Sequence, residues 1–174
     1  MSCESLKAKL RTVPDFPIPG ILFWDVTTLF KDPSGLSEAI DALYDMYKDS
    51  GVTKVVGIES RGYVLGAALA ARLGAGFVMA RKKGKLPSDT ISIEYSKEYG
   101  TDTIEIHSDA ISSEDVVLIH DDLMATGGTA AAIERLVRKF SPRKIMANFL
   151  IEIEELNGRK LFSDDVDVKS VIKV

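Results

Sequence analysis

Short apolar runs alternate along this chain with segments whose apolar residues recur at helical spacing. The clearest predicted helix starts after Asp32-Pro33, with Ser34 as its N-cap, and stops at Gly51. A spacing of three or four residues between apolar positions is typical of one helix face packed on a core. Those positions are Leu36, Ile40, Leu43, Tyr44 and Tyr47.

Five runs rich in β-branched residues indicate buried strands. They cover residues 54–58, 76–80, 115–120, 144–153 and 168–174. Between them we expect one helix from Tyr63 to Leu73 and another that carries Ile133, Leu136, Val137 and Phe140 on one face. Strands that alternate with helices imply an α/β fold, with a parallel sheet covered on both faces. Ligands bind such sheets at the carboxyl ends of the strands, so the segments after the strands carry the functional information.

Two segments depart from this alternation within what we expect to be a single domain, 1–174. Residues 1–30 form an N-terminal arm, and Pro14, Pro17, Pro19 and Gly20 mark a segment within it that cannot be regular helix. Residues 81–106 begin with a basic run and continue as two alternating segments, 90–95 and 103–106. Such alternation predicts an exposed antiparallel hairpin or flap.

Composition and charge restrict the classes of partner. The chain is 45% hydrophobic and 28% charged, with a formal net charge of -4, so no global basic field predicts a nucleic acid partner. The only cysteine, Cys3, excludes an internal disulfide framework and fits a reducing compartment. No apolar run has transmembrane length, and residues 1–11 lack the apolar stretch of a secretory signal. We therefore expect a cytoplasmic protein with no membrane partner.

The most informative segment follows the predicted strand at 115–120. Two carboxylates, Asp121 and Asp122, precede a turn of small residues that opens a helix. The free N–H groups and the positive end of a helix bind anions, so the turn predicts a monophosphate site. Carboxylates accept hydrogen bonds from vicinal hydroxyls, and a ribose 5-phosphate would satisfy both parts. The turn consists of Ala125, Thr126, Gly127, Gly128 and Thr129.

Asp121-Asp122 and the turn Ala125-Thr126-Gly127-Gly128-Thr129 closely resemble the signature with which type I phosphoribosyltransferases bind 5-phosphoribosyl 1-pyrophosphate (PRPP). Other segments resemble the adenine-specific branch of that family, and the likeness covers nearly the whole chain in the right order. Those segments are Asp15–Phe23, Glu59–Gly62, Arg81–Pro87, Glu98–Gly100 and Ile151–Arg159.

The resemblance implies a fold and a reaction. The fold is a central, mostly parallel twisted sheet flanked by helices, with a small N-terminal hood over the base and a flexible antiparallel flap. The reaction joins adenine to PRPP, giving AMP and pyrophosphate in purine salvage, with Mg²⁺ held mainly by substrate and water rather than by direct protein ligands.

The resemblance also assigns roles to residues. Asp121 and Asp122 would contact the ribose hydroxyls, and residues 125–129 would hold the 5-phosphate. Ser60, Arg61 and Gly62 look like the pyrophosphate loop, which in the family often carries a non-proline cis peptide; without that context, Arg61 could equally be a surface arginine. Leu22 and Phe23 would contact adenine, while the flap would contribute Tyr99 and a proton-exchanging Glu98.

The basic run Arg81-Lys82-Lys83-Gly84-Lys85 has two interpretations. A solvated basic turn is the usual outcome for such a run. Four unpaired like charges would instead tolerate one another if pyrophosphate enters between them. The resemblance places Lys82 and Lys85 near the pyrophosphate and implies a homodimer in which Arg81 reaches the neighbouring active site.

Three positions stand apart from the family pattern or carry no role in it. Trp24 occupies a position where many relatives have arginine, and it would either stack on the base or simply close the hood. His120 stands where a small apolar residue is common, and we expect it to pack at the strand end. We expect His107 at the surface.

Three alternatives stay open from the sequence. The same fold could act on xanthine or hypoxanthine. It could also be a PRPP-sensing regulator, although no DNA-binding segment is appended to this acidic chain. A simple phosphate-binding module would leave the acidic pair and the flap unexplained.

Overall fold

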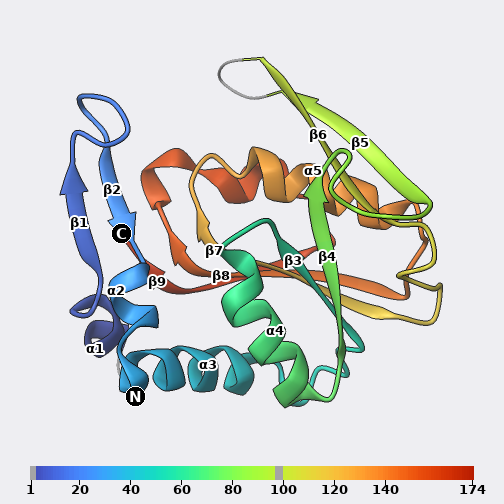
Figure 1. Cartoon of the computed structure of the whole chain (residues 1–174). Helices are drawn as coiled ribbons and strands as arrows, with labels where there is room; N and C mark the ends of the chain where they lie inside the picture. Colours follow the sequence, from blue (N-terminus) through green and yellow to red (C-terminus); the bar gives the residue numbers. More distant parts are fainter. Residues whose placement is uncertain (1–2, 97–99) are drawn as a thin grey trace.

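The computed structural model describes residues 3–96 and 100–174, which form a seven-stranded sheet with helices on both faces (Figure 1). The strand order is β5-β6-β4-β3-β7-β8-β9. The five neighbouring strands β4, β3, β7, β8 and β9 run parallel. β6 pairs antiparallel with both β4 and β5. The α/β prediction is therefore confirmed. The strands are β3 (Lys54–Ile58), β4 (Gly76–Lys82), β5 (Thr90–Ser96), β6 (Thr101–His107), β7 (Val116–Met124), β8 (Lys144–Glu152) and β9 (Asp167–Lys173).

The central strand β7 shows why both faces are covered. Val117 and Ile119 belong to the hydrophobic cluster under α5 (Gly128–Arg138), while Leu118 belongs to the cluster under α3 (Pro33–Tyr47) and α4 (Gly62–Leu73). Successive side chains of a strand point to opposite faces, so a continuous apolar run needs a layer on each side. Figure 1 shows α5 on one side of the sheet and α3 and α4 on the other.

Some predicted boundaries were wrong in informative ways. The N-cap of α3 is Asp32, not Ser34: its carboxylate accepts a hydrogen bond from the Ser34 N–H at 3.1 Å, and Pro33 occupies the first helical position. The helix ends at Tyr47, before Gly51. The predicted helix that carries Phe140 is also shorter than expected, because α5 ends at Arg138.

The hood is a small antiparallel pair, β1 (Arg11–Pro14) and β2 (Leu22–Asp25), flanked by the short helices α1 (Cys3–Lys7) and α2 (Thr27–Phe30). An ion pair between Arg11 and Asp25 joins its strands. Figure 1 shows the hood and the β5–β6 flap rising on opposite sides of the sheet's carboxyl edge, so a ligand at that edge would lie between them. In the described part of the chain, no helix is both long and apolar enough to cross a bilayer.

Candidate active site

The acidic pair lies at the end of a strand rather than in a turn. β7 continues past His120 through Asp121 and Asp122 as far as Met124. The Asp122 side chain is 5% exposed and lies 2.7 Å from Nε of Arg61, while its N–H donates to Oδ1 of Asp121 at 2.9 Å. The structure therefore brings together the predicted ribose-binding acids and the predicted pyrophosphate-binding arginine.

Close packing at Gly62 joins the two segments. A Cβ atom on Gly62 would lie 2.8 Å from Oδ1 of Asp121 and 2.9 Å from the carbonyl oxygen of His120, so only glycine allows α4 to begin against β7. The peptide bond between Glu59 and Ser60 is cis, as the resemblance implies for this loop. The loop therefore presents Arg61 directly beside the end of β7.

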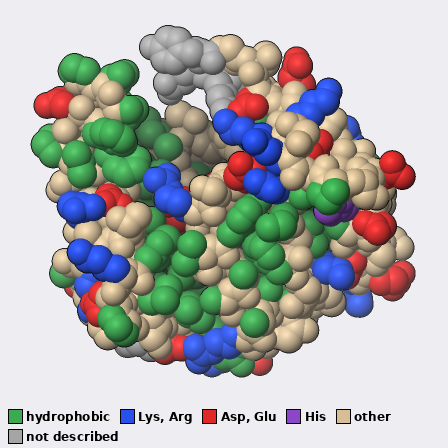
Figure 2. Space-filling model, in the orientation of Figure 1, with side chains coloured by type: hydrophobic (Ala, Val, Ile, Leu, Met, Phe, Trp, Pro, Cys, Tyr) green, Lys and Arg blue, Asp and Glu red, His purple; other side chains and the backbone are tan. Residues whose placement is uncertain are grey.

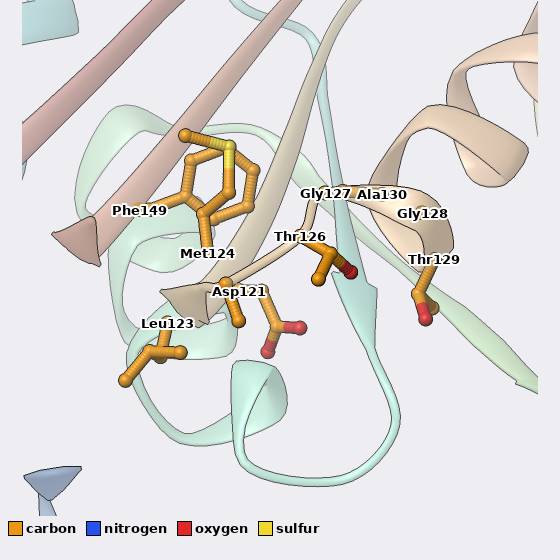
Figure 3. Close-up of a pocket in the computed structure, with 10 residues that line it drawn as sticks. Asp121, Leu123, Met124, Thr126, Gly127, Gly128, Thr129, Ala130 and Phe149 are labelled. Atoms are coloured by element: carbon orange, nitrogen blue, oxygen red, sulfur yellow. The ribbon is translucent and has the colours of Figure 1, made fainter. Parts of the chain in front are cut away.

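The predicted phosphate turn forms a pocket of about 130 Å³ together with Asp121. Gly127 adopts φ +79°, a conformation that favours glycine, and α5 starts at the next residue. In Figure 3 the carboxylate of Asp121 and the side chains of Thr126 and Thr129 border the same space. Phe149, from β8, contributes an apolar wall that the sequence motif does not reveal. The lining comprises Asp121, Leu123, Met124, Ala125, Thr126, Gly127, Gly128, Thr129, Ala130 and Phe149.

The electrostatics of the acidic pair are asymmetric. Desolvation, followed by the charge of neighbouring Asp122, raises the pKa of Asp121 well above its ordinary value of 3.8. Arg61 opposes this shift but does not cancel it. A cation or a hydroxyl donor that enters the pocket would favour the charged carboxylate and so lower this pKa again.

The predicted run of four unpaired cations was wrong. Arg81 and Lys82 lie in β4, and both are paired: Nε of Arg81 is 3.1 Å from Oε2 of Glu59, and Nζ of Lys82 is 3.5 Å from Asp102. Lys83 and Lys85 have no carboxylate within ion-pair distance in the described part of the chain. Among the described residues, therefore, no carboxylate neutralises Lys83 or Lys85, whereas Arg81 and Lys82 are paired.

Two carboxylates fix the shape of the basic segment. Oε2 of Glu59 accepts the backbone N–H of Lys82 at 3.1 Å in addition to the Arg81 guanidinium. Glu105, which is buried, accepts the N–H groups of Gly84 at 3.0 Å and Leu86 at 3.2 Å. Because Glu59 precedes the cis peptide bond, it ties the basic segment to the Arg61 loop, a role that the sequence did not indicate.

The structure separates the two residues that we expected to contact the base together. The ring of Phe23 lies 5.4 Å from the guanidinium carbon of Arg61 and packs edge-on against Phe16. Leu22 and Trp24 instead line a different pocket of about 400 Å³, together with residues of the C-terminal segment. Phe23 therefore faces Arg61, while Leu22 and Trp24 face the other pocket.

The histidines take up structural positions. His120 is fully buried, and its Nδ1 lies 2.8 Å from Oδ1 of Asn148. The expected packing role agrees with this burial, but His120 lies in the middle of β7 rather than at its end. Nε2 of His107 contacts the carbonyl oxygen of Pro87 at 2.6 Å, at the base of the flap. Glu98 and Tyr99, the predicted flap residues, lie outside the described residues.

Comparison with known proteins agrees with this geometry. The family model for the phosphoribosyl transferase domain matches residues 25–173. An adenine phosphoribosyltransferase of Phocaeicola vulgatus is 65% identical over 99% of both chains. The crystal structure of the Rhodothermus marinus adenine phosphoribosyltransferase, 52% identical, superposes with a TM-score of 0.93 over 99% of this chain and 98% of that one. A Giardia lamblia homologue crystallised with 9-deazaadenine is 40% identical. Its superposition covers 100% of this chain and 98% of that one, with a TM-score of 0.92.

This chain belongs to the phosphoribosyltransferase family. Its fold is that of the type I class. Within the family it groups with the adenine phosphoribosyltransferases of purine salvage.

Proposed function

We propose that this protein transfers the 5-phosphoribosyl group of PRPP to adenine, forming AMP and releasing pyrophosphate. The observation that carries the proposal is the single pocket in which Asp121 borders the turn 125–129. Acceptors for sugar hydroxyls and donors for a phosphate lie there at neighbouring positions, which matches the two ends of a ribose 5-phosphate. The Giardia lamblia relative crystallised with 9-deazaadenine supports adenine as the base.

The acidic pair would act on both binding and chemistry. In this proposal Asp121 and Asp122 accept hydrogen bonds from the ribose hydroxyls, and the turn 125–129 holds the 5-phosphate. When the bond from the anomeric carbon to pyrophosphate breaks, positive charge develops on the ribose ring. Two carboxylates fixed beside that ring stabilise the charge without reorganisation.

The leaving pyrophosphate would be held by Arg61 and its neighbours Ser60 and Gly62, together with Lys85 from the basic segment. Lys82 would join them by exchanging the Asp102 carboxylate, 3.5 Å from its exposed ammonium, for a phosphate oxygen. Arg61 offers further N–H donors besides Nε, the atom nearest to Asp122. Mg²⁺ supports this chemistry by neutralising negative charge on the pyrophosphate. We propose that Mg²⁺ would be held mainly by substrate oxygens and water, as the family resemblance implies.

The base would lie against Phe23 on the Arg61 side of the hood, with Leu22 supplying backbone contacts. We propose that the flap closes over it and that Glu98, next to Tyr99, exchanges a proton with the purine ring. Closure would exclude water, which otherwise competes with adenine for the ribosyl group.

A homodimer is supported by an apolar face over α4 and β4, where Figure 2 shows hydrophobic side chains gathered. Val64 and Met79 are 45% and 41% exposed, and Ala67 and Ala71 are exposed beside them. Arg81 lies two residues after Met79 on β4 and so projects to the same face. We propose that this face meets a second copy and that Arg81 there completes the neighbouring site. The cytoplasmic location stays a prediction.

A panel of bases tests the proposed reaction and separates it from the same fold acting on another purine. The enzyme is incubated with PRPP, Mg²⁺ and adenine, hypoxanthine, xanthine or guanine, and nucleotide formation is followed. We expect AMP from adenine, with kcat/KM at least about a hundredfold above the other bases. Equal or better use of hypoxanthine or xanthine would move the assignment to that purine. Failure to form any nucleotide would favour a PRPP-sensing regulator.

A further inference from the structure

We propose that Gly158 and Arg159 are positioning residues that hold the phosphate turn, residues 125–129, in shape from behind. They start the short 3-10 segment η2 (Gly158–Leu161), far along the chain from the turn. The proposal rests on the function above, since it concerns how the same pocket binds the phosphate of PRPP.

The backbones of Gly127 and Gly158 are in contact, and neither residue has room for a side chain. A Cβ atom on Gly127 would lie 2.5 Å from the carbonyl oxygen of Gly158. In the other direction, a Cβ atom on Gly158 would lie 2.7 Å from the carbonyl oxygen of Ala125 and 3.0 Å from the backbone nitrogen of Gly127. Gly127 also needs glycine for its φ of +79°, but Gly158 has no positive φ. Glycine at 158 is therefore required by packing against the turn.

Arg159 anchors this contact to the sheet. Its Nη2 donates to Oε2 of Glu152 at 2.6 Å and to Oγ of Ser170 at 3.0 Å. Its Nε also bonds Glu152, and its Nη1 bonds the carbonyl oxygen of Val168. Glu152 is buried at the end of β8, and the other two partners lie in β9. The guanidinium thus fixes the residue next to Gly158 to two strands at once.

The support from Gly158 and Arg159 should affect binding of the 5-phosphate rather than of the base. The backbone N–H groups of the turn bind a phosphate only if they converge on one point, and a shift of a few tenths of an ångström spoils several hydrogen bonds together. PRPP and AMP both carry the 5-phosphate, whereas adenine does not. Loss of the support should therefore weaken PRPP and AMP binding and spare adenine.

Gly158→Ala tests this directly. We expect the KM for PRPP and the inhibition constant of AMP to rise about tenfold, equivalent to about 1.4 kcal/mol, while the KM for adenine changes less than about twofold. Gly35→Ala is the matched control. Its Cβ would lie 3.0 Å from the carbonyl oxygen of Leu29 and 2.9 Å from Cδ of Lys9, a similar crowding remote from the pocket. This control should lower the melting temperature and leave both KM values unchanged.

Arg159→Lys is a second variant that tests the same inference, and its KM values are used if Gly158→Ala is not folded at the assay temperature. Lysine keeps the charge beside Glu152 but cannot span the contacts to Val168 and Ser170, so we expect a rise of about threefold in the KM for PRPP alone. An unchanged KM for PRPP in the folded variants, or equal rises for PRPP and adenine, would overturn the inference. A wild-type enzyme that forms no AMP would instead refute the proposed function.

Discussion

Nε of Arg61 lies 2.7 Å from the buried carboxylate of Asp122, and this ion pair joins the two halves of the site. Arg61 comes from the loop before α4, and Asp122 comes from the end of β7. Phe23 of the hood stacks near the same guanidinium. One arginine therefore connects the segments proposed to hold pyrophosphate, ribose and base.

Asp122→Asn should separate catalysis from folding. The amide can still accept a hydrogen bond from Arg61, and the arginine side chain is 44% exposed, so the guanidinium stays solvated and the fold loses little. The variant lacks the negative charge that would stabilise the ribosyl cation, so we expect kcat/KM for PRPP to fall at least about a hundredfold. Steady-state kinetics and a melting curve check both parts. Near-normal kinetics would exclude the ribose role of Asp122.

Asp121→Asn should gain stability while it loses activity. Because the pKa of Asp121 is raised in the fold, the folded chain binds a proton more tightly than the unfolded chain does. The contribution of Asp121 to the free energy of unfolding therefore falls as pH rises above about 4, and the neutral amide avoids that loss. We expect a higher melting temperature than wild type at pH 7, with the difference vanishing toward pH 4. A variant that is less stable at pH 7 would show that this carboxylate is satisfied in the fold.

The His120–Asn148 pair should make the protein acid-sensitive. Burial lowers the pKa of His120 from 6.5 to about 4. Between these values the unfolded chain binds a proton that the folded chain does not, so the His120 contribution to the free energy of unfolding falls as pH is lowered, by up to about 3 kcal/mol. Denaturant unfolding of the wild type and of His120→Val between pH 7 and pH 4 isolates this contribution, because the opposite contribution of Asp121 is present in both proteins. In a His120→Val variant the dependence over that range should be reduced by the same amount.

The double variant His120→Val with Asn148→Ala supplies the control. Each single change leaves a buried polar partner without its hydrogen bond, at a cost of about 1–3 kcal/mol. Removal of both avoids that cost, so the double variant should be less destabilised than the sum of the two singles. Strictly additive effects would mean that the two side chains do not depend on each other.

The sequence predicted those features that are encoded locally. The alternation of strands and helices follows from periodicity, and the turn at residues 125–129 follows from the small residues that stand directly before a helix start. The acidic pair was placed correctly at a strand end, although β7 runs further than its apolar part indicates.

Features that depend on strand register could not be predicted. Arg81 pairs with Glu59 because Ile58 and Ala80 are partners in the β3–β4 ladder, and this brings residues far apart in sequence together. The contact of Gly158 with the phosphate turn is equally non-local. The error at the start of α3 has a local cause: Asp32 and Ser34 both suit an N-cap, and Pro33 decides between them by taking the first helical position.

A crystal structure of the protein with AMP tests the central claim most directly. The account predicts the 5-phosphate on the backbone N–H groups of residues 125–129 and the ribose hydroxyls within hydrogen-bond distance of Asp121 and Asp122. Density for the nucleotide at another place, with that turn empty, would contradict it.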